Sequence, residues 1–218
     1  MNNKKILIVS GGNIEDDFAI EWINEYQPDY IIVADSGMEF MRRAGKHPDM
    51  IIGDFDSVKQ DTLAFFKNQS AILWKELNPI KDDTDTEFAI RQAICIGAKE
   101  ITLIGGTGTR LDHVLGNIAL LGIGLTEQVQ LQIIDAHNRI RMIDAPICIK
   151  KEEQFGSYVS LIPYNGEVCG LTLKGFKYPL TDFNLKPYNS LGISNEIIEE
   201  KAEISFEAGT LLIIESRD

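Results

Sequence analysis

The chain has 218 residues, a formal net charge of -12, and a composition that is 44% hydrophobic and 25% charged. A chain of this length builds one large core or two small ones, and the composition excludes the disordered and membrane-spanning classes. The excess of Asp and Glu argues against a nucleic-acid partner or an anionic membrane surface, and the early apolar runs are too short for a signal segment. We therefore expect a cytoplasmic protein of two closely packed units.

The first part of the chain, from residue 4 to about 134, alternates short apolar runs with amphipathic ones. This pattern is typical of a parallel sheet flanked by helices. The predicted strands are 5–10, 30–35, 50–55, 71–76, 100–105 and 129–134, and the predicted helices are 16–26, 37–44, 58–68, 85–97 and 110–122. The last helix has a stripe at the spacing of a core-facing surface, formed by Leu111, Val114, Leu115, Ile118 and Leu121.

Four strand-to-helix junctions fit the capping-box pattern, in which side chains satisfy the first free amides of a helix. The pairs are Ser36 with Glu39, Ser57 with Gln60, Thr84 with Glu87, and Thr109 with Asp112. The helices therefore begin just beyond the carboxyl ends of strands. In an open parallel sheet, ligands bind at that edge.

The residue pattern changes after about Asp144. Helical periodicity ends there, and β-rich runs follow with Gly, Pro and Asn between them. We predict an α/β unit over residues 1–140 and a small antiparallel sandwich or barrel over residues 141–218. Cys95, Cys148 and Cys169 are isolated, odd in number and without C-x-x-C spacing, so neither a disulfide framework nor a zinc site is indicated, and we expect buried free thiols.

Acidic side chains gather where the predicted strands end. They are Asp35, Asp54, Asp56, Asp82, Asp83, Asp85 and, in the first turn of the last helix, Asp112. Each alone can be a capping charge worth about 0.3 to 1 kcal/mol. Two carboxylates about 4 Å apart repel by roughly 4 kcal/mol, however, so a cluster calls for a cation. Hard oxygen ligands without His or Cys favour Mg²⁺ on substrate phosphates, with Asp54 and Asp56 as ligands.

The run "IGGTGTRLDH" supplies glycines that let a ligand approach the backbone, followed by a helix start that suits an anion. It is neither a Walker A loop nor a dinucleotide fingerprint, and a plain glycine-rich turn is the alternative. Arg110 and Lys81 are candidates to neutralise phosphate oxygens, or else are solvated surface charges. The loop 10–12 is a second phosphate-side candidate or a tight turn, and His113 is more simply a structural residue.

Several longer motifs occur together in order: "ADSGMEFMRRAGKHPDMIIGDFDSV", "KDDTDTEFAI", "GGTGTRLDHVLGNI", "LTLKGFKYPL" and "GISNE". With them the chain resembles the bacterial branch of the thiamine pyrophosphokinase family, from about residue 7 to the C-terminus. The resemblance implies that an α/β domain, 1–140, binds ATP and that a β-sandwich, 141–218, binds thiamine. It also implies a homodimer with active sites between subunits, and transfer of the pyrophosphoryl group of ATP to thiamine, releasing AMP.

The resemblance also implies roles for single residues. Mg²⁺ would be held by Asp54, Asp56 and Asp82, and the acidic shell would be completed by Asp85 and Asp112. The nucleotide cleft would be lined by Asp35, Ser36 and Gly37, and thiamine would be contacted by Ser194 and Asn195 of the other subunit. Apart from the resemblance, the residues themselves predict further phosphate contacts from Lys81, Gly105, Gly106, Thr107 and Arg110. Eukaryotic members tend to have Gln at Lys81 and His113, so their contacts do not transfer to these two. No Trp lies near Ser194, and the aromatic partner of thiamine stays open.

Chemically, such a site positions phosphates and stabilises charge, and Asp112 is a candidate to accept the alcohol proton. Two other readings stay open: a Mg²⁺-dependent phosphohydrolase that activates water, and a nucleotide-binding or thiamine-binding regulator without turnover. The first would release phosphate without thiamine. The many carboxylates argue against the regulator, because a protein that only binds an anion would carry fewer negative charges at its site.

Overall fold

The computed structural model describes residues 4–56, 58–78 and 83–218. The chain forms two compact units, one ending at Ala136 and the other running over His137–Asp218. The predicted boundary at residue 140 falls inside the first strand of the second unit, which starts at Asn138. Among the described residues, no helix has the length and apolar character needed to span a membrane.

The first unit is a six-stranded parallel sheet with five helices, in the part of the chain that the structure describes. Its strands are β1 (Lys5–Val9), β2 (Tyr30–Ala34), β3 (Met50–Gly53), β4 (Leu73–Glu76), β5 (Glu100–Ile104) and β6 (Gln130–Ile134). Its helices are α1 (Asp16–Tyr26), α2 (Gly37–Arg43), α3 (Gln60–Lys67), α4 (Asp85–Cys95) and α5 (Leu111–Glu127). Every strand pair in the order β4-β3-β2-β1-β5-β6 is parallel.

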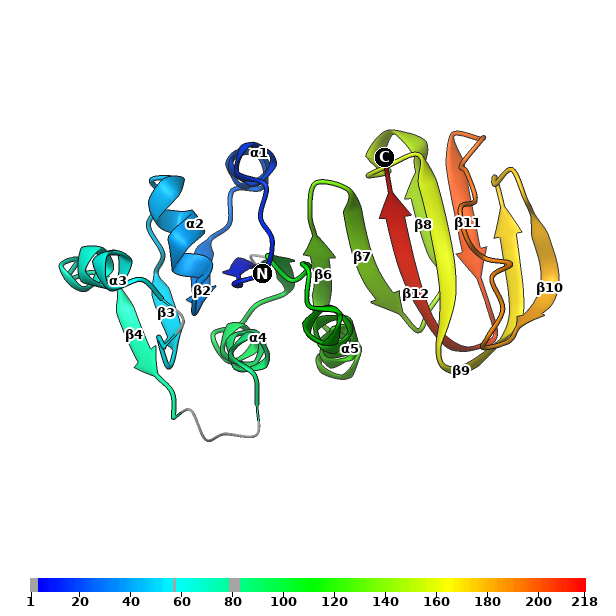
Figure 1. Ribbon diagram of the computed structural model, residues 1–218. Helices are drawn as coiled ribbons and strands as arrows, with labels where there is room; N and C mark the ends of the chain where they lie inside the picture. Colours follow the sequence, from blue (N-terminus) through cyan, green and yellow to red (C-terminus); the bar gives the residue numbers. More distant parts are fainter. Residues whose placement is uncertain (1–3, 57, 79–82) are drawn as a thin grey trace. The chain divides into compact units, whose positions relative to one another are not determined.

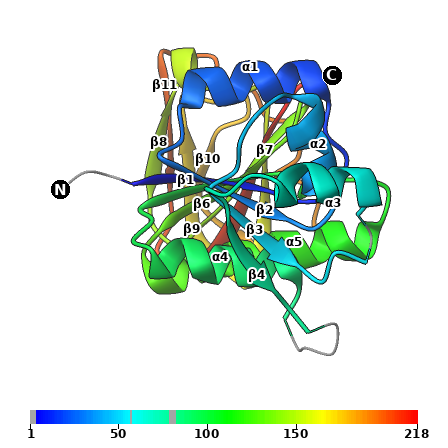
Figure 2. The same cartoon turned by 90° about the vertical axis from the view of Figure 1, so that its left-hand side faces the viewer.

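The helices cover both faces of this sheet, α1 to α3 on one face and α4 and α5 on the other (Figure 1, Figure 2). The central strands are therefore continuous apolar runs: Ile6, Leu7 and Ile8 of β1 are fully buried. The connection after β1 leads to one face and the connection after the neighbouring β5 leads to the other. The space beyond the carboxyl ends of β1 and β5 is thus the switch point where doubly wound sheets bind ligands.

Helix α5 does not present its predicted stripe to the core. Leu111 and Leu115 are 71% and 66% exposed, and of the five stripe residues only Leu121 is buried. The buried side is centred on Leu121 and Gly124, where an added Cβ at Gly124 would lie 2.8 Å from the Cβ of Leu131 on β6. The helix is apolar on almost every side, so periodicity alone could not select the face that packs on the sheet.

Of the four predicted capping boxes, one is confirmed in its N-cap bond. The Thr84 hydroxyl accepts a hydrogen bond from the Glu87 amide at 3.1 Å. The predictions for Ser36 and Thr109 are wrong: Ser36 has helical rather than extended backbone and makes no capping bond, and α5 starts one residue later, with Arg110 at its cap. Ser57 lies outside the described residues.

The second unit is antiparallel. Its strands are β7 (Asn138–Ile143), β8 (Ile147–Lys150), β9 (Tyr158–Lys174), β10 (Leu180–Leu185), β11 (Lys201–Ser205) and β12 (Ala208–Ser216), with a short 3-10 turn, η1 (Lys151–Glu153). β12 pairs with β7 and with the first half of β9, whereas β10 and β11 pair with the second half of β9, and β8 pairs with β11. The mixed fold that the sequence predicts is confirmed, while the sandwich detail stays a prediction.

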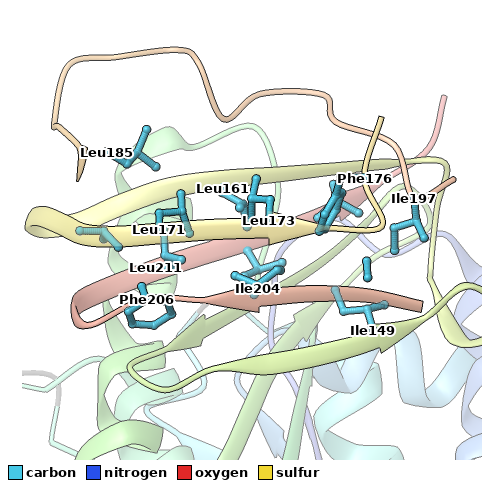
Figure 3. Packing of buried hydrophobic residues seen from close by; sticks show 14 residues of the cluster. Ile149, Leu161, Leu171, Leu173, Phe176, Leu185, Ile197, Ile204, Phe206 and Leu211 are labelled. Atoms are coloured by element: carbon cyan, nitrogen blue, oxygen red, sulfur yellow. The ribbon is translucent and has the colours of Figure 1, made fainter. Parts of the chain in front are cut away.

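The strand β9 joins two runs that the sequence predicts as separate strands. Asn165 and Gly166 have positive φ in its middle, and the register of the pairing with β12 shifts between Tyr164 and Cys169, as at a β-bulge. Apolar side chains from β8, β9, β11 and β12 form the core of this unit, among them Leu161, Leu173 and Ile204 (Figure 3).

The prediction of buried thiols is wrong. Cys95 and Cys148 are exposed, and Cys169 is half-buried; all three are free. Cys95 ends α4, and Cys148 lies on β8, where alternate side chains face outward.

Candidate active site at the carboxyl edge of the parallel sheet

The loops after β1 and β5 are bonded to each other at the switch point. The amides of Gly12 and Asn13 donate to the carbonyl oxygens of Gly105 and Thr107 at 2.9 and 2.8 Å. Gly105 has a φ of 71°, and an added Cβ would lie 2.3 Å from the carbonyl oxygen of Ser10, so only glycine fits there. The two loops therefore hold each other in place, and both are phosphate-binding candidates of the sequence analysis.

The carbonyl groups of the glycine-rich loop are occupied within the protein. Asn117 of α5 donates to the carbonyl oxygen of Gly106 at 2.8 Å, and the Thr107 hydroxyl donates to Asp135 at 2.8 Å. Carbonyl oxygens facing an anion would repel it. A loop whose carbonyls accept bonds from the protein is therefore compatible with phosphate.

The segment after β2 packs against the same junction. An added Cβ at Gly11 would lie 2.0 Å from the Ser36 hydroxyl oxygen, and one at Gly37 would lie 2.3 Å from the carbonyl oxygen of Val9. The Ser10 and Thr86 hydroxyls share a buried hydrogen bond of 2.8 Å, which fixes the start of α4 at the end of β1. Loops from three strands and one helix start thus meet at one edge.

Three of the predicted carboxylates converge at this edge. Burial, a hydrogen bond with Asp85 and the charges of Asp85 and Asp54 raise the pKa of Asp35 to about 7. The ends of β2 and β3 also touch, because the Phe55 amide donates to Asp35 at 3.4 Å. Asp35 and Phe55 both have positive φ, an uncommon backbone state that clusters at functional sites.

Asp56 lies two residues after Asp54, beyond the end of β3. Its backbone amide donates to the Asp54 side chain at 3.2 Å, which closes a tight turn, while its own side chain is exposed. Asp82 and Lys81 fall in a gap of the described chain, and their roles stay predictions.

The described residues form no group of three or more His, Cys, Asp or Glu that could hold a metal ion. The donor set nevertheless fits magnesium, which commonly takes one or two carboxylates and completes its shell with water and substrate phosphates. Burial chiefly, and then the neighbouring carboxylates Asp85 and Asp54, raise the pKa of Asp35, so these acidic groups lie close enough to interact.

Arg110 and Asp112 form an exposed pair at the start of α5. Their side chains are 70% and 66% exposed and lie 2.7 Å apart. The hydrogen bond from Arg110, followed by the one from the His113 amide, lowers the pKa of Asp112 to about 2. A carboxylate with so low a pKa is a poor proton acceptor near neutral pH, so the pair suits charge positioning better than base catalysis.

In the second unit, the side chain of Asn195 is engaged with backbone. It accepts from the Tyr178 amide at 3.0 Å and donates to the Tyr178 carbonyl at 2.8 Å, and Asn195 is only 6% exposed. Its neighbour Ser194 has a φ of 56°, and its amide donates to the Ser160 hydroxyl at 3.0 Å. A direct bond from Asn195 to thiamine stays a prediction, and the visible role of Asn195 is to fix Tyr178 beside Ser194.

Tyr178 is an exposed aromatic residue that the sequence analysis did not select. It is 60% exposed and carries Lys177 over its ring at 5.6 Å. The signal was present, because Tyr178 stands inside the quoted motif "LTLKGFKYPL".

Comparison with known proteins agrees with this architecture. Residues 24–133 match the family described as thiamin pyrophosphokinase, catalytic domain, and residues 145–211 match thiamin pyrophosphokinase, vitamin B1 binding domain. The curated thiamine pyrophosphokinase of Bacillus subtilis is 33% identical over 99% of this chain and its own full length.

Solved structures give the same result. The crystal structure of the Bacillus subtilis thiamine pyrophosphokinase has a TM-score of 0.89 at 34% identity, covering 99% of this chain and 100% of that one. The structure of the enzyme from Geobacillus thermodenitrificans has a TM-score of 0.84 at 32% identity, with 98% of each chain covered.

The parallel unit with its acidic edge, joined to an antiparallel companion, defines a kinase-type transferase. More specifically, the chain belongs to the thiamine pyrophosphokinase family. The predicted fold class and the predicted activity, transfer of pyrophosphate from ATP to thiamine with release of AMP, are thereby confirmed.

Proposed function

We propose that this chain carries out its family's transfer at the carboxyl edge of the parallel sheet, with the ATP phosphates beside Asp35, Asp54 and Asp85. The observation that carries the proposal is the meeting of these groups: Asp35 is hydrogen-bonded to Asp85 and is held against the end of β3, where the Phe55 amide donates to it at 3.4 Å. Asp54 and Asp56, with Asp82, would hold Mg²⁺. When bound, the ion would neutralise phosphate charge and polarise the phosphoryl oxygens.

The chain's own residues position the phosphates. The junction of the loops 10–13 and 105–107 presents glycine backbone to the triphosphate, and Ser36 and Gly37 line the nucleotide side. Arg110 would place a guanidinium on phosphoryl oxygens, as would the ammonium group of Lys81. Fixed positive charge aimed at the developing negative charge stabilises the transition state.

Thiamine would lie against the segment of the second unit that contains Ser194. Tyr178 offers the ring surface for the aromatic parts of thiamine, and Asn195 holds that tyrosine by two backbone hydrogen bonds. Cation–π attraction between a tyrosine and a thiazolium ring is worth roughly 0.5 to 2 kcal/mol. The assembly would be a homodimer with active sites between subunits, working in the cytoplasm.

Incubation with ATP, Mg²⁺ and thiamine, followed by measurement of AMP and thiamine diphosphate, tests the proposal. We expect AMP only when thiamine is present. Phosphate release without thiamine would instead indicate a phosphohydrolase, and saturable binding without product would indicate a regulator. Asp54→Asn should lower turnover by at least about a hundredfold, the size of effect seen when one charge-stabilising group is lost.

The base role of Asp112 is tested separately with Asp112→Asn. Because the pKa of Asp112 is held at about 2, we expect the variant to keep the pH dependence of kcat between about pH 5 and pH 8, whatever its absolute rate. Loss of the acid limb of the pH profile in this variant alone would restore Asp112 as the proton acceptor.

A further inference from the structure

Phe55 has a backbone conformation that a bulky residue rarely adopts. Its φ is 64°, in the left-handed region that favours glycine and asparagine. It stands between Asp54 and Asp56, directly beyond the end of β3. Strained backbone of this kind persists only where the surrounding structure holds it in place. The contacts of Phe55 must therefore supply what stabilises this turn.

The ring of Phe55 is buried against an aromatic residue of the neighbouring strand. Phe55 is 9% exposed, whereas Asp54 is half-buried and Asp56 is exposed. Trp74 of β4 meets the Phe55 ring edge to face, with ring centroids 5.4 Å apart and planes at 77°. Aromatic pairs prefer this arrangement because the positive edge of one ring faces the negative face of the other. The ring is thus anchored inside the protein while the acidic residues on both sides of it remain accessible.

The peptide groups on both sides of Phe55 contact carboxylates. The Phe55 amide donates to the Asp35 side chain at 3.4 Å, and the Asp56 amide donates to the Asp54 side chain at 3.2 Å. The Phe55 carbonyl oxygen accepts from the Val58 amide at 3.2 Å, which closes the turn. A rotation of the backbone at Phe55 would therefore move carboxylates that follow two different strands, β2 and β3.

We propose that Phe55 is a positioning residue: its ring, anchored on Trp74, holds the left-handed turn that orients Asp54 and Asp56 toward a shared divalent cation. The inference rests on the proposed function, which places Mg²⁺ on these two carboxylates, and it extends that function to two side chains without any metal-binding group. Trp74 acts through Phe55, and Phe55 acts through the backbone of the turn.

The demands of the metal explain why such an anchor matters. Mg²⁺ requires near-ideal octahedral geometry, so a small rotation of a ligating carboxylate weakens its binding. Groups that orient the ligands of a metal typically contribute 10- to 100-fold to its affinity. A buried phenylalanine that only filled the core would instead contribute to the stability of the fold and leave metal affinity unchanged. Metal affinity and stability are therefore the two quantities to separate.

The test measures metal affinity of the full-length protein, with Mn²⁺ in place of Mg²⁺ and a non-hydrolysable ATP analogue present. The electron paramagnetic resonance signal of free Mn²⁺ gives the Kd without any turnover. Phe55→Gly removes the ring but adopts the φ of 64° readily, so it separates the anchor from the backbone strain. We expect the Kd for Mn²⁺ to rise about tenfold or more in this variant.

Trp74 provides an independent second variant, because its substitution leaves the sequence of the turn intact. Trp74→Ala should weaken Mn²⁺ binding to a similar extent, whereas Trp74→Phe keeps an aromatic ring and should restore most of the affinity. The matched control is Phe66→Leu. Phe66 of α3 is fully buried and also lies edge to face with an aromatic neighbour, Phe65, at 5.0 Å, so its substitution should lower stability but leave the Kd for Mn²⁺ unchanged.

Wild-type Mn²⁺ affinity in folded Phe55→Gly and Trp74→Ala, with the fold checked by far-UV circular dichroism, would overturn the positioning role. An equal loss of affinity in Phe66→Leu would overturn it as well, because the effect would then follow stability alone. Thiamine-dependent AMP formation by the wild-type chain is read in parallel. Its absence refutes the proposed function, whereas AMP formation together with unchanged Mn²⁺ affinity in the variants refutes only the role of Phe55.

Discussion

Asp35 shows how one residue links backbone, charge and site. Its φ of 46° turns the chain directly after β2, and an added Cβ at Gly53 would lie 2.2 Å from its carboxylate oxygen. The side chain is thereby held against the end of β3, close to the charges of Asp54 and Asp85. The glycine at position 53 and the strained backbone at position 35 together place the Asp35 carboxylate against the end of β3.

The raised pKa of Asp35 predicts a pH-dependent stability. Between the ordinary value of 3.8 and about 7 the folded protein keeps a proton that the unfolded chain has lost, so stability falls as pH rises through this window. Asp35→Asn removes the titrating group, so the free energy of unfolding of the variant should rise relative to that of wild type as pH rises. Urea unfolding in the presence of EDTA at about pH 5 and about pH 8 measures it. A gain that is the same at both pH values would contradict the prediction.

Glu215 is a second residue whose contribution to stability depends on its surroundings. Its side chain is fully buried on β12 and pairs with Arg139 and, at 3.4 Å, with Arg141. Arg139 also donates to the carbonyl oxygen of Glu153 at 2.9 Å, which ties η1 to β7. One carboxylate thus balances two guanidinium groups inside the second unit.

Removing that carboxylate should be costly. Glu215→Ala leaves the guanidinium groups of Arg139 and Arg141 without their counterion, and breaking a buried pair in this way costs about 3 to 5 kcal/mol. We expect the loss in the free energy of unfolding from urea titration. Glu203→Ala, which removes an exposed partner of Lys201 on β11, is the control and should change stability little. Equal effects of the two substitutions would refute the buried-pair argument.

At the scale of elements, the starts of α4 and α5 offer a matched comparison. Both Thr84 and Thr109 fit the same sequence pattern, yet only Thr84 caps its helix. Thr84→Ala should therefore cost about 1 kcal/mol of stability, whereas Thr109→Ala should be close to neutral. Thermal unfolding of the two variants measures the difference. A comparable loss in both would mean that Thr109 has a role outside capping.

The elements also show where periodicity stops being informative. The strand and helix positions of the first unit follow from alternating apolar runs, and α1 begins and ends at the predicted residues 16 and 26. Helix α5 has so many apolar residues that several faces fit the same spacing. Contact with β6 selected the side of Leu121, and Leu111 and Leu115 of the predicted stripe came to face outward.

At the scale of the whole molecule, the net charge of -12 acts on the substrates in opposite ways. The thiazolium ring of thiamine is a cation, so the field of the protein should assist its arrival, and salt should weaken that assistance. We expect the KM for thiamine to rise a few-fold between low salt and about 0.2 M KCl. Sucrose at equal osmolality is the control and should leave KM unchanged; a KM independent of salt would contradict the prediction.

The sequence by itself determined the order of strands and helices in the first unit, the antiparallel character of the second, and the family. These depend on local apolar periodicity and on long motifs, which are readable without a fold. The tertiary structure decided which acidic groups meet, since Asp35 and Asp54 follow different strands and Asp85 begins α4, and only the parallel sheet brings these three segments to one edge. It also decided which face of α5 is buried and which hydroxyl caps a helix, because packing and backbone angles select among side chains that look equivalent in sequence.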